Sequence, residues 1–518
     1  MSILRILFSP KTQAVVVNTL SKKLSDNLSA LKRLLPSEDI LTYAFETENA
    51  LSCAVVYADG VVNKQLLGDL IARPLSRTSF GKEGGMSALN AETVAKTLLF
   101  PELKQTENLD DAQTEILDGN SLLLIDGLAV GFIVGAKFLP TRAVIEPPTD
   151  VAVKGPREGF IEDVKTNMGL VRKRLKTPDL RFEVLRVGKR SDTAVALCWL
   201  EGTSDSEVKE TVKKKIQEIQ IDNIPDSSYI SAMITPRKHS LFRTVGTTEK
   251  PDIFTAKIAE GRVGILVDGS PIALTVPYVL NEDLQSSEDY FISPFMATTI
   301  RFLRFISLLV AILLPAFYVS AQLFKMQLLP LGLMLTIASS VRDLPLSPSL
   351  EMFVVLLLLE ILKEASIRMP KYVGMSLSVV GALVLGETAV SAGFLSTPAI
   401  IIVAFSGICL YTVPNFVETG SILRWLFLLV GGSIGPFGIV LLLAFVLYYL
   451  LSADCFSAPL LAPFSPLTMH DLRDTIVKYD MLSLKKRPFI FRSKNRTRLR
   501  PSNEKEGGMY ETKPKKGE

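Results

Sequence analysis

The chain has 518 residues, enough for several domains, and its charged residues are spread unevenly along it. Charge is frequent through about position 290, as in a soluble domain, whereas residues 425–453 carry none. A formal charge of +4 is too small to indicate binding of nucleic acid. The two histidines and four cysteines lie far apart without zinc-ligand spacing, so we expect no metal site. The soluble part lacks phosphate-loop, dinucleotide and nucleophile-elbow motifs, so we expect no cofactor and no enzymatic activity.

The N-terminal part of the sequence has the pattern of a soluble α/β domain. Leucines recur at helical spacing over 21–35 and predict a helix. The apolar run 51–57, closed by Asp59-Gly60, predicts a strand followed by a turn. Residues 121–134 predict two strands joined at Asp126-Gly127, because a hairpin turn needs the positive φ that glycine adopts without strain.

Residues 154–275 repeat this plan. They predict, in order, a helix ending at Leu175, strands over 182–187 and 193–200, a helix over 208–219 and a hairpin around Asp268-Gly269. The tetrapeptides at 124–127 and 266–269 are near copies, 142 positions apart. This similarity reflects either the commonness of Asp-Gly hairpins or a duplicated subdomain. Both interpretations predict two α/β subdomains with a boundary near Pro147-Pro148.

The charged segment 154–160, bounded by glycine and proline, joins the two predicted subdomains. Its structural interpretation is a linker turn before a helix. Because binding residues are often found on loops between rigid elements, Arg157 and Glu158 are alternatively candidates for a contact with another subunit.

Six apolar stretches follow and predict an α-helical multi-pass membrane domain, because a spanning helix needs about 20 apolar residues. They cover 305–324, 328–340, 349–369, 376–396, 399–417 and 422–451. The second is short enough for a re-entrant segment, and the last is broken by glycines and Pro436 into one kinked helix or two half-helices. Four to six crossings are therefore expected. Even parity is preferred, because Arg301, Arg304 and the basic C-terminal tail place both ends in the cytoplasm.

One of these stretches, 349–369, carries several charges on one helical face. They are Glu360, Lys363, Glu364 and Arg368. An ionised side chain in mid-bilayer costs about 2.5–3.5 kcal/mol on insertion scales, so this face should meet protein, water or headgroups. Mutual pairing of these residues at the interface is the favoured interpretation.

The stretch 376–396 is rich in glycine, alanine and serine and contains a single acid, Glu387. Small residues allow helices to pack closely in lipid, and a ring of such helices can also line a narrow pore. Val380, Val384 and Glu387 fall on one helical face and are the candidate pore-lining residues. The alternative is tight helix packing with Glu387 in a salt bridge.

Several longer motifs resemble the A subunits of GerA-type spore germinant receptors. The matching stretches are 154–160 (KGPREGF), 260–269 (EGRVGILVDG), 287–290 (SEDY) leading into 293–295 (SPF), 381–386 (GALVLG) and 461–464 (LAPF). The resemblance implies a nutrient receptor subunit in the spore inner membrane, acting with a transporter-like B subunit and a C lipoprotein. It also implies self-assembly into a ligand-gated ion channel that starts germination.

The resulting domain prediction has four parts. Subdomains over 1–148 and 149–290 precede a membrane domain over 291–455 and a basic cytoplasmic tail over 456–518. Two other functions stay open at this stage. One is a non-conducting scaffold or signal-relay subunit. The other is a secondary transporter, which the broken last stretch suggests but which lacks an evident inverted repeat among its spans.

Overall fold

The computed structural model describes residues 19–80, 89–98, 100, 103–137, 154–236, 240–342, 344–368 and 384–499. They belong to two compact units. The α/β unit comprises Met1–Val151, Pro156–Thr235 and Thr247–Val276, and the helical unit comprises Ala152–Gly155, Pro236–Gly246 and Pro277–Glu518. Within the α/β unit we call the described residues up to 137 the first module and those from 156 to 276 the second module.

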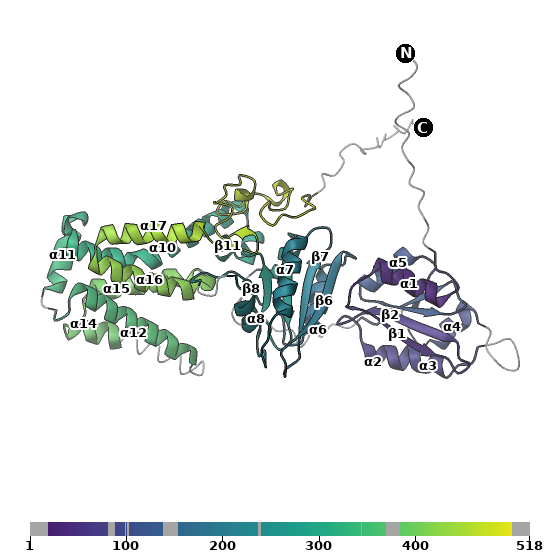
Figure 1. Ribbon diagram of the computed structural model, residues 1–518. Coiled ribbons are helices and arrows are strands. Elements are labelled where there is room, and N and C mark those ends of the chain that lie inside the picture. Colours follow the sequence, from purple (N-terminus) through teal and green to yellow (C-terminus); the bar gives the residue numbers. More distant parts are fainter. Residues whose placement is uncertain are drawn as a thin grey trace, which may run out of the picture. The chain divides into compact units, whose positions relative to one another are not determined.

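The first module is a five-stranded sheet with helices on both faces (Figure 1). Its elements are α1 (Leu24–Leu34), β1 (Ile40–Glu46), β2 (Ser52–Ala58), α2 (Lys64–Leu67), η1 (Gly68–Ala72), α3 (Arg73–Ser76), α4 (Ala91–Thr97), β3 (Leu103–Thr106), α5 (Leu109–Leu117), β4 (Ser121–Ile125) and β5 (Gly131–Val134). The strand order is β1-β2-β4-β5-β3, and all neighbours are antiparallel. Apolar residues of α1 and α5 cover one face, and those of α2, η1, α3 and α4 cover the other. Each sheet face therefore has its own core.

The second module has the same plan. Its elements are α6 (Val164–Arg174), β6 (Leu180–Val187), β7 (Thr193–Leu200), α7 (Ser206–Gln217), α8 (Ser227–Ile234), β8 (Gly246–Thr248), α9 (Pro251–Ala259), β9 (Val263–Val267) and β10 (Ala273–Val276). The strand order β6-β7-β9-β10-β8 repeats that of the first module position by position. Helices α6 and α9 pack on one face through a core that includes alternate residues of β7.

The registers of the two sheets also coincide. Ile40 lies opposite Ala58 in the first module, as Leu180 lies opposite Leu200 in the second. The equivalent residues are 140 positions apart before the first β-turn of each module and 142 after it. Gly127 and Gly269 both have positive φ, at 88° and 83°, as the Asp-Gly turns require. The structure therefore favours the duplicated subdomain over two unrelated hairpins.

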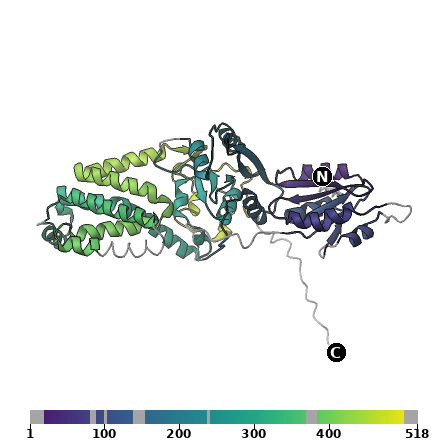
Figure 2. The ribbon, with the colours of Figure 1, turned by 90° about the horizontal axis from the view of Figure 1, so that it is seen from below.

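The helical unit contains longer helices with short connections. Its elements are η2 (Leu280–Leu284), η3 (Ser287–Tyr290), α10 (Pro294–Phe324), η4 (Met326–Leu328), α11 (Leu331–Val341), α12 (Pro348–Arg368), η5 (Val384–Thr388), α14 (Ala389–Ser391), α15 (Thr397–Tyr411), η6 (Pro414–Phe416), α16 (Val417–Ser433), α17 (Pro436–Leu451), β11 (Asp454–Cys455), β12 (Ala458–Pro459), η7 (Asp471–Arg473) and η8 (Met481–Ser483). Helices α10, α15, α16 and α17 lie side by side (Figures 1 and 2).

Two helix boundaries differ from the sequence prediction, and the structure decides between the two alternatives left open for the last stretch. Helix α10 begins at Pro294, because Ser293 caps it by accepting a hydrogen bond from the Met296 amide. Arg301 and Arg304 are therefore inside the helix and not before it. The stretch predicted over 399–417 ends at Tyr411, and the chain turns by 112° before α16. Pro414 lies in this break, where its ring cannot continue the preceding helix. The last stretch forms two helices, α16 and α17, separated at Gly435 with φ of 80°.

Helix α10 alone, among the described residues, is long and apolar enough on its own to cross a membrane. It has 31 residues and contains an 18-residue stretch with a mean hydropathy of 2.2. The bent pair of α15 with residues 414–433 passes the same test if it is counted as one span. Of the predicted stretch 376–396, only residues from 384 onward are among those described, as η5 and α14. The number of crossings stays a prediction.

Candidate functional site

The candidate pore segment is described only in part. Val380 lies outside the described residues, and Val384 begins η5. Glu387 is exposed in the same segment. Gly386 and Gly393 are open to their surroundings, since a methyl group added at either would meet nothing within 4 Å among the described residues. The small residues at these two positions are therefore not required by close packing inside the described part of this chain.

A buried ion pair joins the helices of the helical unit. Arg424 of α16 is 1% exposed, and its Nη2 donates to Glu360 Oε1 of α12 at 2.8 Å. Its Nη1 donates to Ser406 Oγ of α15 at 3.2 Å, and that hydroxyl donates to the Ala311 carbonyl of α10 at 2.8 Å. Four helices thus share one polar network, which satisfies a charge that would be costly to bury alone.

The charged face of α12 pairs largely as its spacing predicts. Glu360 and Lys363 form an ion pair, and Arg368 Nη2 lies 2.6 Å from Glu364 Oε1. The partner that the sequence analysis missed is Arg424. It is the only basic residue of α16, in the apolar part of that helix, and this feature indicates a buried acidic partner.

A second cluster of charges fastens the C-terminal segment to the start of α10. Arg301 is buried, and it contacts Asp289 through Nε and Asp474 through Nη1, both at 2.9 Å. Arg304 also donates to Asp289 at 2.9 Å. Burial and the nearby charge of Arg301 lower the pKa of Lys478, whose ammonium donates to the Asp289 carbonyl. Described residues of the predicted tail therefore dock on the helical unit.

The two candidates for a contact with another subunit precede α6. Arg157 is exposed. The Glu158 carboxylate accepts hydrogen bonds from Lys173 Nζ at 2.8 Å and Arg174 Nη2 at 2.7 Å. Burial opposes ionisation of Glu158, but the hydrogen bond and charge of Lys173, with the charge of Arg174, hold its pKa below the usual value. Glu158 thus pairs with the basic end of α6 in its own chain.

A junction that the sequence does not predict joins the two modules. Arg172 of α6 and Asp39, just before β1, are both buried. Arg172 Nε and Nη2 donate to the two carboxylate oxygens of Asp39 at 2.9 and 2.8 Å. Gly60 lies so close to α6 that an added Cβ would clash with the backbone of Lys165. A bidentate pair and a glycine contact therefore lock the modules together.

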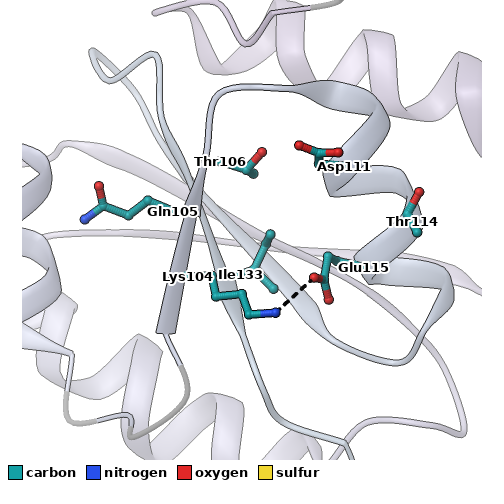
Figure 3. Close-up of a pocket in the computed structure, with 7 residues that line it drawn as sticks. All are labelled: Lys104, Gln105, Thr106, Asp111, Thr114, Glu115 and Ile133. Atoms are coloured by element: carbon teal, nitrogen blue, oxygen red, sulfur yellow. Dashed lines mark hydrogen bonds and ion pairs between the residues drawn. The ribbon is translucent and has the colours of Figure 1, made fainter. Parts of the chain in front are cut away.

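A charged hollow lies on the first module between β3 and α5 (Figure 3). It has a volume of about 240 Å³, and Lys104 Nζ lies 3.5 Å from Glu115 Oε1 across it. The remaining lining residues are Gln105, Thr106, Asp111, Thr114 and Ile133. Lys104 and Glu115 neutralise each other, and Asp111, which is exposed to water, leaves the lining with one negative charge.

Comparison with known proteins gives a consistent result along nearly the whole chain. The model of a family described as "Bacillus/Clostridium GerA spore germination protein" matches residues 28–490. Spore germination protein B1 of Bacillus subtilis is 31% identical over 477 residues, which cover 90% of this chain and 96% of that protein. An uncharacterized membrane protein of the same organism, YfkQ, is 33% identical over 474 residues, covering 90% and 91% of the two chains.

A solved structure also matches about half of the chain. It is the crystal structure of the N-terminal domain of the A subunit of the Bacillus megaterium spore germinant receptor GerK3. The match has 28% sequence identity and a TM-score of 0.39, and it covers 51% of this chain and 98% of that one.

Proposed function

The chain belongs to the Bacillus/Clostridium GerA family of spore germination proteins, and from this premise we propose that it is the A subunit of a nutrient receptor that forms a germinant-gated ion channel. The receptor would lie in the spore inner membrane, with the α/β unit and the C-terminal segment in the cytoplasm. Its partners would be a transporter-like B subunit, a C lipoprotein and further copies of this chain.

The open surroundings of the small-residue segment carry this proposal. A Cβ added at Gly386 would meet nothing within 4 Å among the described residues, and Glu387 is exposed in what is otherwise an apolar stretch. Gly393 has a φ of 70°, which by itself favours glycine. In lipid, glycine is favoured where another helix approaches closely, and an acid is favoured where it meets water or a cation. Packing of this segment against copies of itself would satisfy both requirements, with Val380 and Val384 at the constriction.

Gating follows from the same arrangement. Germinant binding on a partner subunit would favour the open assembly only by the difference in its affinity for the open and closed states. The Glu360–Arg424 network holds α10, α12, α15 and α16 together and would make them move as one body around the pore segment.

Measuring current through the purified full chain in a planar bilayer tests the proposal directly. We expect cation currents, with raised basal leak in V384A because a smaller side chain widens the constriction. E387Q should lower the cation current by removing the charge that attracts cations. I401V is the matched control, since Ile401 is a 61% exposed apolar residue of another helix.

In spores, V384A should release cations without germinant. Normal germinant-dependent release in both V384A and E387Q, together with no current from reconstituted oligomers, would overturn the channel. That outcome would leave the non-conducting scaffold, which the buried ion pairs between helices of one chain favour, because they immobilise charge instead of exposing it to a pore.

A further inference from the structure

The first module docks on the second through one set of surface residues on each side. We call Ser37, Glu38, Asp39 and Gly60 the plug, and Gly169, Arg172, Phe182 and Val184 the socket. Beyond the Asp39–Arg172 pair, the Phe182 amide donates to Ser37 Oγ at 3.0 Å and the Val184 amide donates to Glu38 Oε2 at 2.6 Å. The plug thus caps the free edge of β6, the outermost strand of its sheet.

Because the modules are duplicated, the first module should also have a surface equivalent to the socket, and the second module a surface equivalent to the plug. The second module has a second plug, formed by Thr177, Pro178, Asp179 and Gly202. Its equivalence is structural, since the Glu201 amide donates to the Asp179 carbonyl at 2.8 Å as the Asp59 amide donates to Asp39 at 2.7 Å. Gly202 keeps the positive φ of Gly60, at 74° against 79°.

The second plug is exposed where the first is buried. Asp39 is 1% exposed, whereas Asp179 and Gly202 are both exposed. A Cβ at Gly60 would clash with α6, but one at Gly202 would meet nothing within 4 Å among the described residues. The unusual backbone of Gly202 is thus retained although nothing in the described part of this chain packs on it.

The first module likewise has a second socket, formed by Ser29, Lys32, Thr42 and Ala44 on α1 and the edge strand β1. All four residues are exposed. A hollow of about 590 Å³ lies here, and its lining includes Leu28, Ser29, Lys32, Thr42 and Val56. Their counterparts in the second module are Met168, Gly169, Arg172, Phe182 and Cys198, all of which are buried. The hollow is therefore the unfilled copy of the site that receives Asp39.

We propose that the second socket of one copy of this chain binds the second plug of a neighbouring copy, with Lys32 pairing with Asp179. The charges are complementary, as in the Arg172–Asp39 pair. Since each copy offers one free plug and one free socket, the contact is head-to-tail and closes into a ring when the rotation per copy allows. This contact would help to assemble the oligomeric channel proposed above, and its biological role rests on that proposed function.

Two differences predict that the contact between copies is weaker than the junction inside one chain. Ser29 has a side chain where Gly169 has none, so the neighbouring Gly202 cannot approach as closely as Gly60 does. Lys32 offers a point charge where Arg172 offers a planar fork for both carboxylate oxygens. The assembly would therefore be reversible, while each α/β unit remains intact.

Cross-linking between two tagged populations of the full-length chain tests this proposal. One population carries K32C and the other D179C, and a bismaleimide joins them in detergent or membranes. The four native cysteines are all buried, so the introduced thiols should react first. We expect dimers that carry both tags from the mixture, and at least tenfold fewer from either variant alone. A mixture of K96C with D179C is the control, because Lys96 is exposed on α4, away from the second socket.

Charge reversal and glycine replacement provide an independent measurement, the oligomeric fraction by mass photometry. K32E and D179K should each lower that fraction at least tenfold, and mixing the two variants should restore it. S29G should raise it, because it removes the side chain that holds Gly202 away.

Three results would overturn the contact. They are homodimers from K32C alone, capture of K32C by a different protein in place of D179C, and oligomers that K32E and D179K leave unchanged. Cross-links without any current would contradict the channel and support this contact. Current without the cross-links would support the channel and contradict this contact.

Discussion

Arg172 is one of the largest buried side chains among the described residues, and its buried guanidinium depends on Asp39 for a compensating charge. It also donates to the Thr177 and Leu180 carbonyls, at 3.1 and 3.2 Å, and stacks over Phe182. A buried charge of this kind is tolerated only while its partners are present, because no water can replace them. The pair therefore stabilises the fold only when both partners are present. Removing Asp39 alone should lower the free energy of unfolding more than replacing both Asp39 and Arg172.

We predict that D39A lowers the free energy of unfolding by about 3–5 kcal/mol, since it leaves Arg172 buried and unpaired. The double variant D39L/R172M should recover much of that loss, because apolar side chains of similar size leave no charge to compensate. Urea unfolding of the full chain in detergent, followed by circular dichroism, measures both. K96A is the control and should change stability by less than about 0.5 kcal/mol, as its pair with Glu92 is exposed. A loss in the double variant equal to that in D39A would contradict the explanation.

Helices and strands that are marked by local sequence features were predicted, whereas those that depend on contacts with distant residues were not. Strand β7 was expected over 193–200 and forms over those residues, because its apolar run and flanking turns are local features. The short strands β3 and β8 were missed, since Leu103–Thr106 and Gly246–Thr248 have no apolar alternation and exist only through pairing with β5 and β10. Helix breaks at Pro414 and Gly435 were only partly anticipated, because tertiary packing decides which break is used.

Helices α10 and α16 pack closely at Gly431, where an added Cβ would lie 3.0 Å from the Ala316 carbonyl oxygen. We predict that G431L forces these helices apart and destabilises the helical unit by about 2–3 kcal/mol through overpacking. The same substitution at Gly332, where an added Cβ would meet nothing within 4 Å among the described residues, should be neutral or stabilising by up to about 1 kcal/mol. Thermal unfolding of the two variants in the same detergent compares them. Equal melting temperatures for G431L and G332L would show that α10 and α16 do not depend on this contact.

For the whole molecule, the sequence supports the family and the α/β fold of the N-terminal half, because both are encoded in stretches of neighbouring residues. The duplication stayed open until the strand order and register of the two sheets were compared. The residues of the candidate site were harder to predict from the sequence. The pairs Asp39–Arg172, Glu360–Arg424 and Asp289–Arg301 join residues on different elements, so the local sequence does not show which charges meet, even where a basic residue in an apolar helix, such as Arg424, indicates a buried partner. Glu158, a candidate for a contact with another subunit, pairs with the basic end of α6 in its own chain, and its contact with another subunit stays a prediction.

Assembly of the whole molecule should depend on salt in a way that its folding does not. Lys32 and Asp179 are exposed in the single chain, and a contact between them would stay near water, where ions screen charges over about 10 Å at 0.1 M ionic strength. Arg172 and Asp39 are shielded from those ions by burial. We therefore predict that oligomers dissociate as salt rises from about 0.05 to about 0.5 M, while the unfolding midpoint of the α/β unit stays nearly constant.

Analytical ultracentrifugation across this salt series checks the prediction, with K32Q as the diagnostic variant. It should be largely dissociated already at low salt and respond little to more, because the charge that salt would screen is gone. Oligomers of K32Q that follow the same salt profile as the unmodified chain would mean that other charges hold the copies together. Every copy in a ring would use the same plug and socket, so a substitution such as K32Q weakens all contacts of the ring equally. We therefore expect the ring to dissociate cooperatively instead of losing one copy at a time.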